Sequence, residues 1–226
     1  GADTVVMVEH TKCNSDFVTI TQKTGNKNIC YKAENLKKGD RVLKKGTLLT
    51  PVEIAMLASV GSDPVSVVRR PVIGIIPTGN ELVEPSEVPK QAQIRNSNGY
   101  QLYNQALQAG CIPNYFGIIK DTPEALSKII DREFNNCDIF LFSGGVSMGD
   151  YDYVPDVLKE KGFDLLFQKV AIKPGKPNVF GKKEDTYVFG LPGNPVSTLL
   201  SFELFVKPLC YKLMGNSYKP KIVSGT

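Results

Sequence analysis

Residues 137–154 read CDIFLFSGGVSMGDYDYV. The first six are an apolar run typical of a buried strand, and Tyr153-Val154 begins a segment with helical spacing. Between them lie glycines 144, 145 and 149, followed by Asp150 and Asp152. This order predicts one strand–loop–helix unit of a parallel α/β sheet. The loop either holds a ligand or is a glycine-rich turn with an acidic helix cap.

The same alternation extends over residues 66–216, which we predict to be an α/β domain with three layers and a mainly parallel sheet. Strands are expected at 72–77, 114–119, 164–170, 178–180 and 186–190, and helices at 97–109, 122–134, 153–162 and 195–214 with a possible kink at Pro208. Residues 1–65 predict a partial β-rich domain with runs at 4–9, 17–20 and 41–43, and a connector helix capped by Thr50. Residues 217–226 resemble a linker toward a further domain.

Composition excludes several classes of function. A net charge of +4 without a basic block argues against nucleic acid as a partner. No apolar run reaches the roughly 18 residues that a membrane span needs. The five cysteines are odd in number and lack C-x-x-C spacing, which indicates reduced thiols and a cytoplasmic protein. His10 is the single histidine, so histidine-based triads and multi-histidine zinc sites are not expected.

The loops richest in glycine, proline and charge follow the predicted strands. They read PTGNELVEP, KDTP, SGGVSMGDYD, AIKPGKP and LPGNP. Ligands of parallel α/β sheets bind beyond the carboxyl ends of the strands, so these loops predict a site at one edge. Each has a plainer structural interpretation as well, because Gly, Pro and exposed lysines are common in turns.

The residue types predict a site for a phosphorylated or anionic ligand. Gly144 and Gly145 let backbone amides approach an anion, and Ser147 adds a hydroxyl. Asp150 and Asp152 are oxygen ligands of the kind that Mg²⁺ prefers. Lysines suited to an oxyanion surround the turn after residue 168: Lys169, Lys173 and Lys176.

Six motifs in order, TGNEL, SNGY, IIKDTPEAL, SGGVSMGDYDYV, AIKPGKP and LPGNPVS, closely resemble those of the molybdopterin molybdenumtransferases. These are the molybdenum insertases of molybdenum cofactor synthesis, to which the C-terminal part of gephyrin is related. GADTVVMVE and KKGDRVLKKGTLLTPVEIAMLASVG also resemble this family. The family's subunits are longer and end in a β-barrel domain, so the resemblance implies that this chain is part of a longer protein.

The resemblance implies a homodimer that inserts molybdate into adenylylated molybdopterin, with Mg²⁺-assisted release of AMP. The implied catalytic residues are Glu81, Asp121, Asp152 and Lys173, and the implied metal ligands are Asp150 and Asp152. The implied substrate-binding residues are Gly144, Gly145, Ser147, Lys169, Lys176, Pro192, Gly193 and Pro195. Phosphoryl chemistry depends on positioning and charge neutralisation, which suits a chain almost without histidine.

Two alternatives share this fold. One is the related adenylyltransferase, whose glycine loop usually reads Gly-Gly-Thr-Gly where this chain has GGVSMGD. The other is a non-catalytic scaffold, which need not keep the carboxylates and lysines. One residue departs from the family pattern: Asn35 stands where an aspartate is usual, outside the predicted α/β domain.

Overall fold

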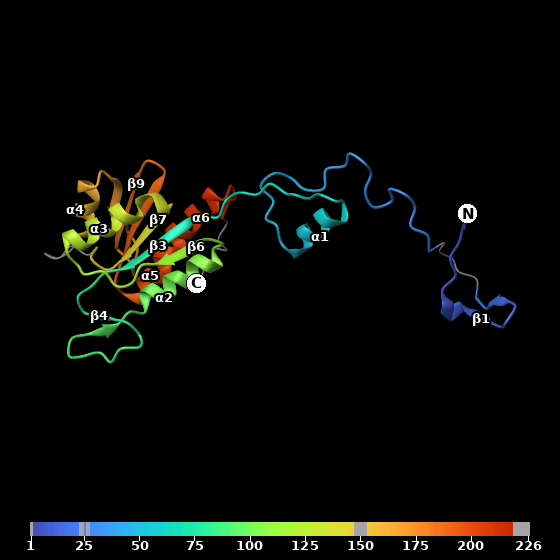
Figure 1. The fold of residues 1–226 in the computed structure, drawn as a ribbon, viewed down its shortest axis with the longest axis horizontal. Helices are drawn as coiled ribbons and strands as arrows, with labels where there is room; N and C mark the ends of the chain where they lie inside the picture. The colour runs from blue at the N-terminus through green and yellow to red at the C-terminus, as the bar shows by residue number, and fades with distance from the viewer. Residues whose placement is uncertain (1, 23–24, 26–27, 147–152, 219–226) are drawn as a thin grey trace. The chain divides into compact units, whose positions relative to one another are not determined.

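The computed structural model describes residues 2–22, 25, 28–146 and 153–218 (Figure 1). The chain divides into two units, Gly1–Asp63 and Pro64–Thr226, which are described separately below. In the part of the chain that is described, no helix is both long and apolar enough to cross a membrane.

The first unit contains few regular elements. They are the 3₁₀ helix η1 (Val8–His10), the antiparallel pair β1 (Thr11–Cys13) and β2 (Val18–Ile20), and helix α1 (Pro51–Ser59). Thr50 caps α1 as expected, with its side chain accepting from the N–H of Val52 and Glu53 completing a capping box. Asn35 is exposed, near a turn of this unit.

The predictions of two strands in the first unit, at residues 4–9 and 41–43, are wrong. Val8 and Glu9 belong to η1, and residues 4–7 and 41–43 form no strand. A strand needs a neighbour to take up its backbone hydrogen bonds, and only β1 and β2 have one among the described residues of this unit.

The second unit is built on a six-stranded sheet with the order β6-β3-β7-β10-β9-β8. The pairs β6–β3, β3–β7 and β7–β10 are parallel, whereas β9 is antiparallel to both β10 and β8. The strands span Val72–Pro77 (β3), Ile112–Tyr115 (β6), Ile139–Ser143 (β7), Asp164–Lys169 (β8), Pro177–Lys183 (β9) and Thr186–Leu191 (β10). A mainly parallel α/β sheet, as predicted, is confirmed.

The edge strand β6 begins and ends earlier than residues 114–119, where the sequence predicted it. Its register with β3 runs from Val72 opposite Ile112 to Ile75 opposite Tyr115. Pro113 is tolerated because β6 has a neighbour on one side only. Beyond Tyr115 the chain leaves the ladder and returns at Ile119, whose N–H donates to the carbonyl oxygen of Pro77 (2.9 Å).

Helices cover both faces of this sheet, which confirms the three layers. On one face, α3 (Pro123–Glu133) and α4 (Val154–Glu160) pack on Phe140 and Phe142 of β7. On the other, α2 (Asn98–Gln108) and the C-terminal helices pack on Ile139 and Leu141. Figure 1 shows α3 and α4 on the opposite side of the sheet from α2 and α5. These four β7 side chains are fully buried, so alternate residues supply the two cores.

Three short elements complete the unit. Strands β4 (Leu82–Val83) and β5 (Ile94–Arg95) form a small parallel pair, and both lie between β3 and α2 in the sequence. The 3₁₀ helix η2 (Phe134–Asn136) joins α3 to β7. The pair β4–β5 begins one residue after Glu81, and it therefore fixes the backbone beside a residue predicted to be catalytic.

The C-terminal helix changes its hydrogen bonding just before Pro208. It consists of α5 (Pro195–Ser201), the π-helical segment η3 (Phe202–Val206) and α6 (Lys207–Leu213). In η3 the N–H of Lys207 donates to the carbonyl oxygen of Phe202. Proline lacks an N–H and its ring clashes with the carbonyl four residues earlier, so a wider turn at this point accommodates Pro208.

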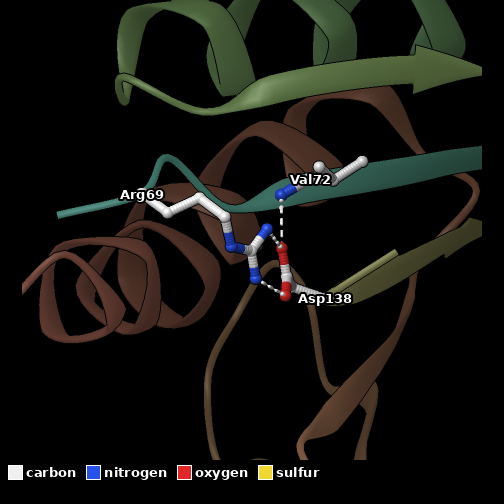
Figure 2. Close-up of polar contacts among 3 residues, drawn as sticks. All are labelled: Arg69, Val72 and Asp138. Carbon is white, nitrogen blue, oxygen red and sulfur yellow. Dashed lines mark hydrogen bonds and ion pairs between the residues drawn. The ribbon is translucent and has the colours of Figure 1, made fainter. Parts of the chain in front are cut away.

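Asp138 precedes β7 and contacts the starts of β3 and β10; Figure 2 shows its contacts with Arg69 and Val72. Its carboxylate accepts from both terminal guanidinium nitrogens of Arg69 (2.9 and 2.6 Å) and from the N–H of Val72 (2.7 Å). Its own N–H donates to the Val72 carbonyl, and its carbonyl accepts from the N–H of Tyr187. Burial alone would raise the pKa of Asp138, but hydrogen bonds from Arg69 and Val72 lower it below its usual value.

We predict that Asp138→Ala lowers the free energy of unfolding by about 1–3 kcal/mol at pH 7, because the N–H of Val72 loses its carboxylate acceptor. Asp138→Asn should cost less, since an amide oxygen can still accept from Val72. Because folding lowers the pKa of Asp138, its ionised form stabilises the fold above the unfolded pKa, about 3.9. That contribution is lost as the pH falls through the lower folded pKa.

Urea titrations between pH 7 and pH 2 measure both effects. The gap between the parent chain and Asp138→Asn should close toward pH 2. The control is Asp156→Ala, which removes an exposed partner of Lys159 and should change stability little. A gap that stays constant with pH would contradict the electrostatic explanation.

Candidate functional site

The five polar loops follow strands that end at one edge of the sheet. Strands β6, β3, β7 and β10 run in parallel, and β8 has the direction of β10 because both are antiparallel to β9. The turn between β8 and β9 therefore lies at the same edge as the loops after β3, β6, β7 and β10. The edge expected from the sequence is the one that the topology produces.

Backbone contacts bring the loops after β3, β7 and β10 together. The N–H of Thr78 donates to the carbonyl oxygen of Ser143 (2.9 Å), and the N–H of Gly144 to that of Leu191 (3.1 Å). Gly144 and Gly145 have φ of +97° and +62°. A Cβ on Gly144 would collide with the carbonyl oxygen of Thr78. Glycine is therefore required at Gly144 by both backbone conformation and space.

A cavity of about 380 Å³ lies between these loops. Five of the residues that the sequence predicted for the site line it together: Glu81, Gly144, Gly145, Pro192 and Gly193. The remaining lining residues are Val146, Gly175, Pro177, Asn194 and Ser197. The cavity thus has contributions from the loops after β3, β7, β8 and β10.

The loop after β10 is held by three side chains. Asn194 caps α5 by accepting from the N–H groups of Val196 (3.0 Å) and Ser197 (3.3 Å). The buried hydroxyl of Thr198 donates to the carbonyl oxygen of Pro192 (2.5 Å). Asn98 donates to the carbonyl oxygen of Gly193 (2.8 Å). Pro195, predicted to bind substrate, is the first residue of α5 and is not among the lining residues.

The segment that carries Glu81 is tied to the sheet through Glu84. Tyr115 at the end of β6 donates to one Glu84 oxygen (2.5 Å), and Tyr100 of α2 donates to the other (3.0 Å). Burial, followed by the hydrogen bond to Glu84, raises the pKa of Tyr115 well above its usual value, so it remains a neutral donor. The carbonyl of Glu81 accepts from the N–H of Ile94 (2.9 Å).

Asp121 lies close to the glycine loop. One of its carboxylate oxygens is 2.9 Å from the position that a Cβ on Gly145 would take. Its N–H donates to the side-chain oxygen of Asn80 (3.4 Å). Glu81 lines the cavity and Asp121 is beside one lining residue, so both acids lie around the glycine loop.

The three predicted lysines lie on or beside the turn between β8 and β9, and all are exposed. Lys169 ends β8 opposite Pro177, and the carbonyl oxygen of Lys176 accepts from the N–H of Val170 (2.9 Å). Lys173 lies in the middle of this turn, two residues before Gly175, which lines the cavity. The turn thus reaches the cavity through its backbone, with the ammonium groups on exposed side chains.

Ser147, Asp150 and Asp152 lie outside the described residues, so their predicted roles stay predictions. Among the residues that are described, no group of three or more His, Cys, Asp or Glu side chains could hold a metal ion. Mg²⁺ usually takes only one or two protein carboxylates and completes its shell with phosphates and water. Glu81 and Asp121 at the glycine loop are compatible with such a site.

Sequence reasoning gave no role to several residues that shape the cavity. Ser197 lies in the first turn of α5 and Asn194 is the cap of this helix. Asn98 contacts both the end of β7 and the loop after β10. The motifs SNGY and LPGNPVS contain these residues, but nothing in the spacing indicated which segments Asn98 would reach. His10 belongs to the first unit and is not among the residues that line this cavity.

Comparisons with known proteins agree with these features. Residues 74–212 match a family described as "Probable molybdopterin binding domain", and residues 1–61 match the "MoeA N-terminal region (domain I and II)". A molybdopterin molybdenumtransferase of Bacillus subtilis is 40% identical over 215 residues, covering 92% of this chain and 50% of the relative. The one from Staphylococcus aureus strain Mu50 is 38% identical over 228 residues, covering all of this chain and 54% of the relative.

Among solved structures, the molybdopterin biosynthesis MoeA protein of Pyrococcus horikoshii has a TM-score of 0.74 and 32% identity, covering 94% of this chain and 53% of that chain. The chain spans about half the length of the curated relatives it matches. Both segments of the chain match the corresponding family descriptions in order. The chain therefore belongs to the molybdopterin molybdenumtransferase family.

Proposed function

We propose that the chain acts in molybdenum cofactor synthesis as a molybdenum insertase. It binds adenylylated molybdopterin and molybdate, transfers molybdenum to the dithiolene sulfurs and releases AMP. The observation that supports this most is the cavity that Glu81 shares with the glycine loop after β7 and the proline loop after β10. The curated relatives from Bacillus subtilis and Staphylococcus aureus carry the name of this activity.

The arrangement of the loops suits a ligand that has both a ring and a phosphoanhydride. The glycines at 144 and 145 allow the backbone to approach phosphate oxygens closely. Pro192 and Gly193 form a wall whose shape is fixed by the contacts of Asn194, Thr198 and Asn98. The proposal assigns the pterin to this wall and the phosphates to the glycine loop, within the domain that we expected at residues 66–216.

The charged residues have two kinds of proposed role. Lys169, Lys173 and Lys176 lie at the turn after β8 and would neutralise molybdate or phosphate oxygens. Glu81 can accept hydrogen bonds from hydroxyl or amino groups of the ligand, and Asp121 lies beside the glycine loop. Mg²⁺, when bound by these acids or by Asp150 and Asp152, would offset the charge of the phosphoanhydride during its cleavage.

Calorimetric titration of the 226-residue chain with adenylylated molybdopterin tests this proposal. Binding that strengthens with Mg²⁺ is the expected result. The relative from Bacillus subtilis, titrated in parallel, shows that the ligand preparation is competent. Binding to the relative without binding to this chain would overturn the assignment of the pterin site to these loops.

We predict that Lys173→Ala raises the molybdate concentration needed for half-maximal turnover about tenfold, because an ammonium group that neutralises an oxyanion is lost. The matched control is Lys182→Ala. Lys182 is also exposed, but in the strand register it lies opposite Asp164 near the start of β8 and Tyr187 near the start of β10. It is therefore at the opposite edge of the sheet. An unchanged molybdate dependence in Lys173→Ala would remove the anion-binding role.

We further predict that Asp152→Ala abolishes Mg²⁺-dependent release of AMP while the pterin nucleotide still binds. The reason is the position of Asp152 directly after the glycine loop, where a carboxylate can share Mg²⁺ with a phosphate. Release of AMP and calorimetric binding are measured on the same preparation. Full turnover in the variant would show that this carboxylate is not a ligand that the reaction needs.

The homodimer and the cytoplasmic location expected from the sequence are part of the same proposal. Val196, Leu199 and Leu204 are exposed apolar side chains along α5 and η3, and a second copy would cover such a surface. Sedimentation velocity of the purified chain measures the assembly, and fractionation of the source cells measures the location. A monomer at all concentrations would contradict the first expectation.

A further inference from the structure

Asn98 hydrogen bonds to the last residue of β7 and to the loop after β10. Its side-chain nitrogen donates to the hydroxyl of Ser143 at the end of β7 (2.9 Å) and to the carbonyl oxygen of Gly193 (2.8 Å). A carbonyl oxygen can only accept, so the contact with Gly193 fixes which end of the amide is nitrogen. Asn98 is thus a bridge between the strand end before the glycine loop and the proline loop.

The bridge is not explained by stability alone. Asn98 is only 9% exposed, and its side-chain oxygen is buried without a hydrogen-bond partner in the described part of the chain. An unpaired buried acceptor is unfavourable for folding. An amide at this position therefore gains two cross-loop contacts at the expense of one unpaired oxygen, a pattern more common at functional sites than in cores.

The geometry of the loops makes this contact consequential. Gly144, which lines the cavity, directly follows Ser143, and Gly193 lies between Pro192 and Asn194 in the cavity wall. The N–H of Gly144 also donates to the carbonyl oxygen of Leu191, which joins the same two loops at the level of the backbone. Asn98 adds a second attachment from helix α2, so the separation of the loops is fixed at two points.

We propose that Asn98 is a positioning residue that sets the spacing between two loops. They are the glycine loop, of which residues 144–146 are described, and the proline loop at residues 192–194. It acts through Ser143 and Gly193 and is not itself among the residues that line the cavity. This inference rests on the proposed function for its effect on ligand binding. The spacing itself can be measured without a ligand.

The same helix supplies a matched control. Gln105 is also 9% exposed, and its amide nitrogen donates to two acceptors, the carbonyl oxygen of Leu199 (3.3 Å) and a carboxylate oxygen of Glu203 (3.2 Å). It lies seven residues further along α2, about 10 Å from Asn98. Its partners belong to α5 and η3, and Gln105 does not line the cavity.

The first experiment measures amide hydrogen exchange by NMR in the ligand-free chain for Asn98→Ala, Asn98→Asp and Gln105→Ala. We expect exchange at Gly144–Val146 and Gly193–Asn194 to become about tenfold faster in both Asn98 variants and to stay unchanged in Gln105→Ala. Aspartate keeps the size of asparagine but cannot donate when ionised. Comparing the two Asn98 variants therefore separates hydrogen bonding from packing.

The second experiment titrates the same variants with adenylylated molybdopterin. The affinity should fall about tenfold in both Asn98 variants and stay at the parent value in Gln105→Ala, even where the variants are equally destabilised. Equal exchange in all three variants would overturn the positioning role. So would unchanged affinity in Asn98→Asp when the parent chain binds. A parent chain that fails to bind contradicts the proposed function, while the exchange data still decide on the spacing of the loops.

Discussion

The parallel pairing of β7 with β3 on one side and β10 on the other is the constraint on which the rest of this domain depends. It aligns three strand ends at one edge, and hydrogen bonds from Thr78 to Ser143 and from Gly144 to Leu191 continue the two ladders into the loops. The loops cannot shift independently, because any displacement would leave buried backbone groups unpaired. The constraint is tightest at Gly144, because the carbonyl oxygen of Thr78 leaves no room there for a side chain.

The two ends of β7 have different tasks. At its start, Asp138 holds β3 and β10 through one carboxylate and two backbone contacts, supported by Arg69. At its end, Ser143 and Gly144 meet residues of the cavity wall. Strong, charge-assisted contacts at the start can stabilise the sheet without placing a fixed charge in the cavity. The loops at the other end therefore do not have to supply these stabilising charges, and their side chains can serve ligand binding.

The sequence predicted the parts of the fold that depend on local pattern. The apolar run of β7 and the helix cap at Thr50 were found because apolar runs and capping chemistry act within a few residues. It failed where pairing decides: residues 4–9 are apolar enough for a strand, yet a strand forms only where a partner exists, as between Thr11 and Ile20. The early end of β6 has the same cause, because its ladder with β3 stops at Tyr115.

The candidate site shows the same division. Glu81, Gly144 and Pro192 could be predicted from motifs, because each is informative by residue type. Asn98 could not, because its importance comes from two partners that are 45 and 95 residues away in sequence. In a chain almost without histidine, the site depends on backbone amides, lysines and carboxylates, and these work only at set distances. The residues that set those distances, Asn98, Asn194 and Thr198, are uncharged, so no charge pattern in the sequence marks them. In a site of this kind, amides and hydroxyls that fix the loops determine whether the charged groups can act together.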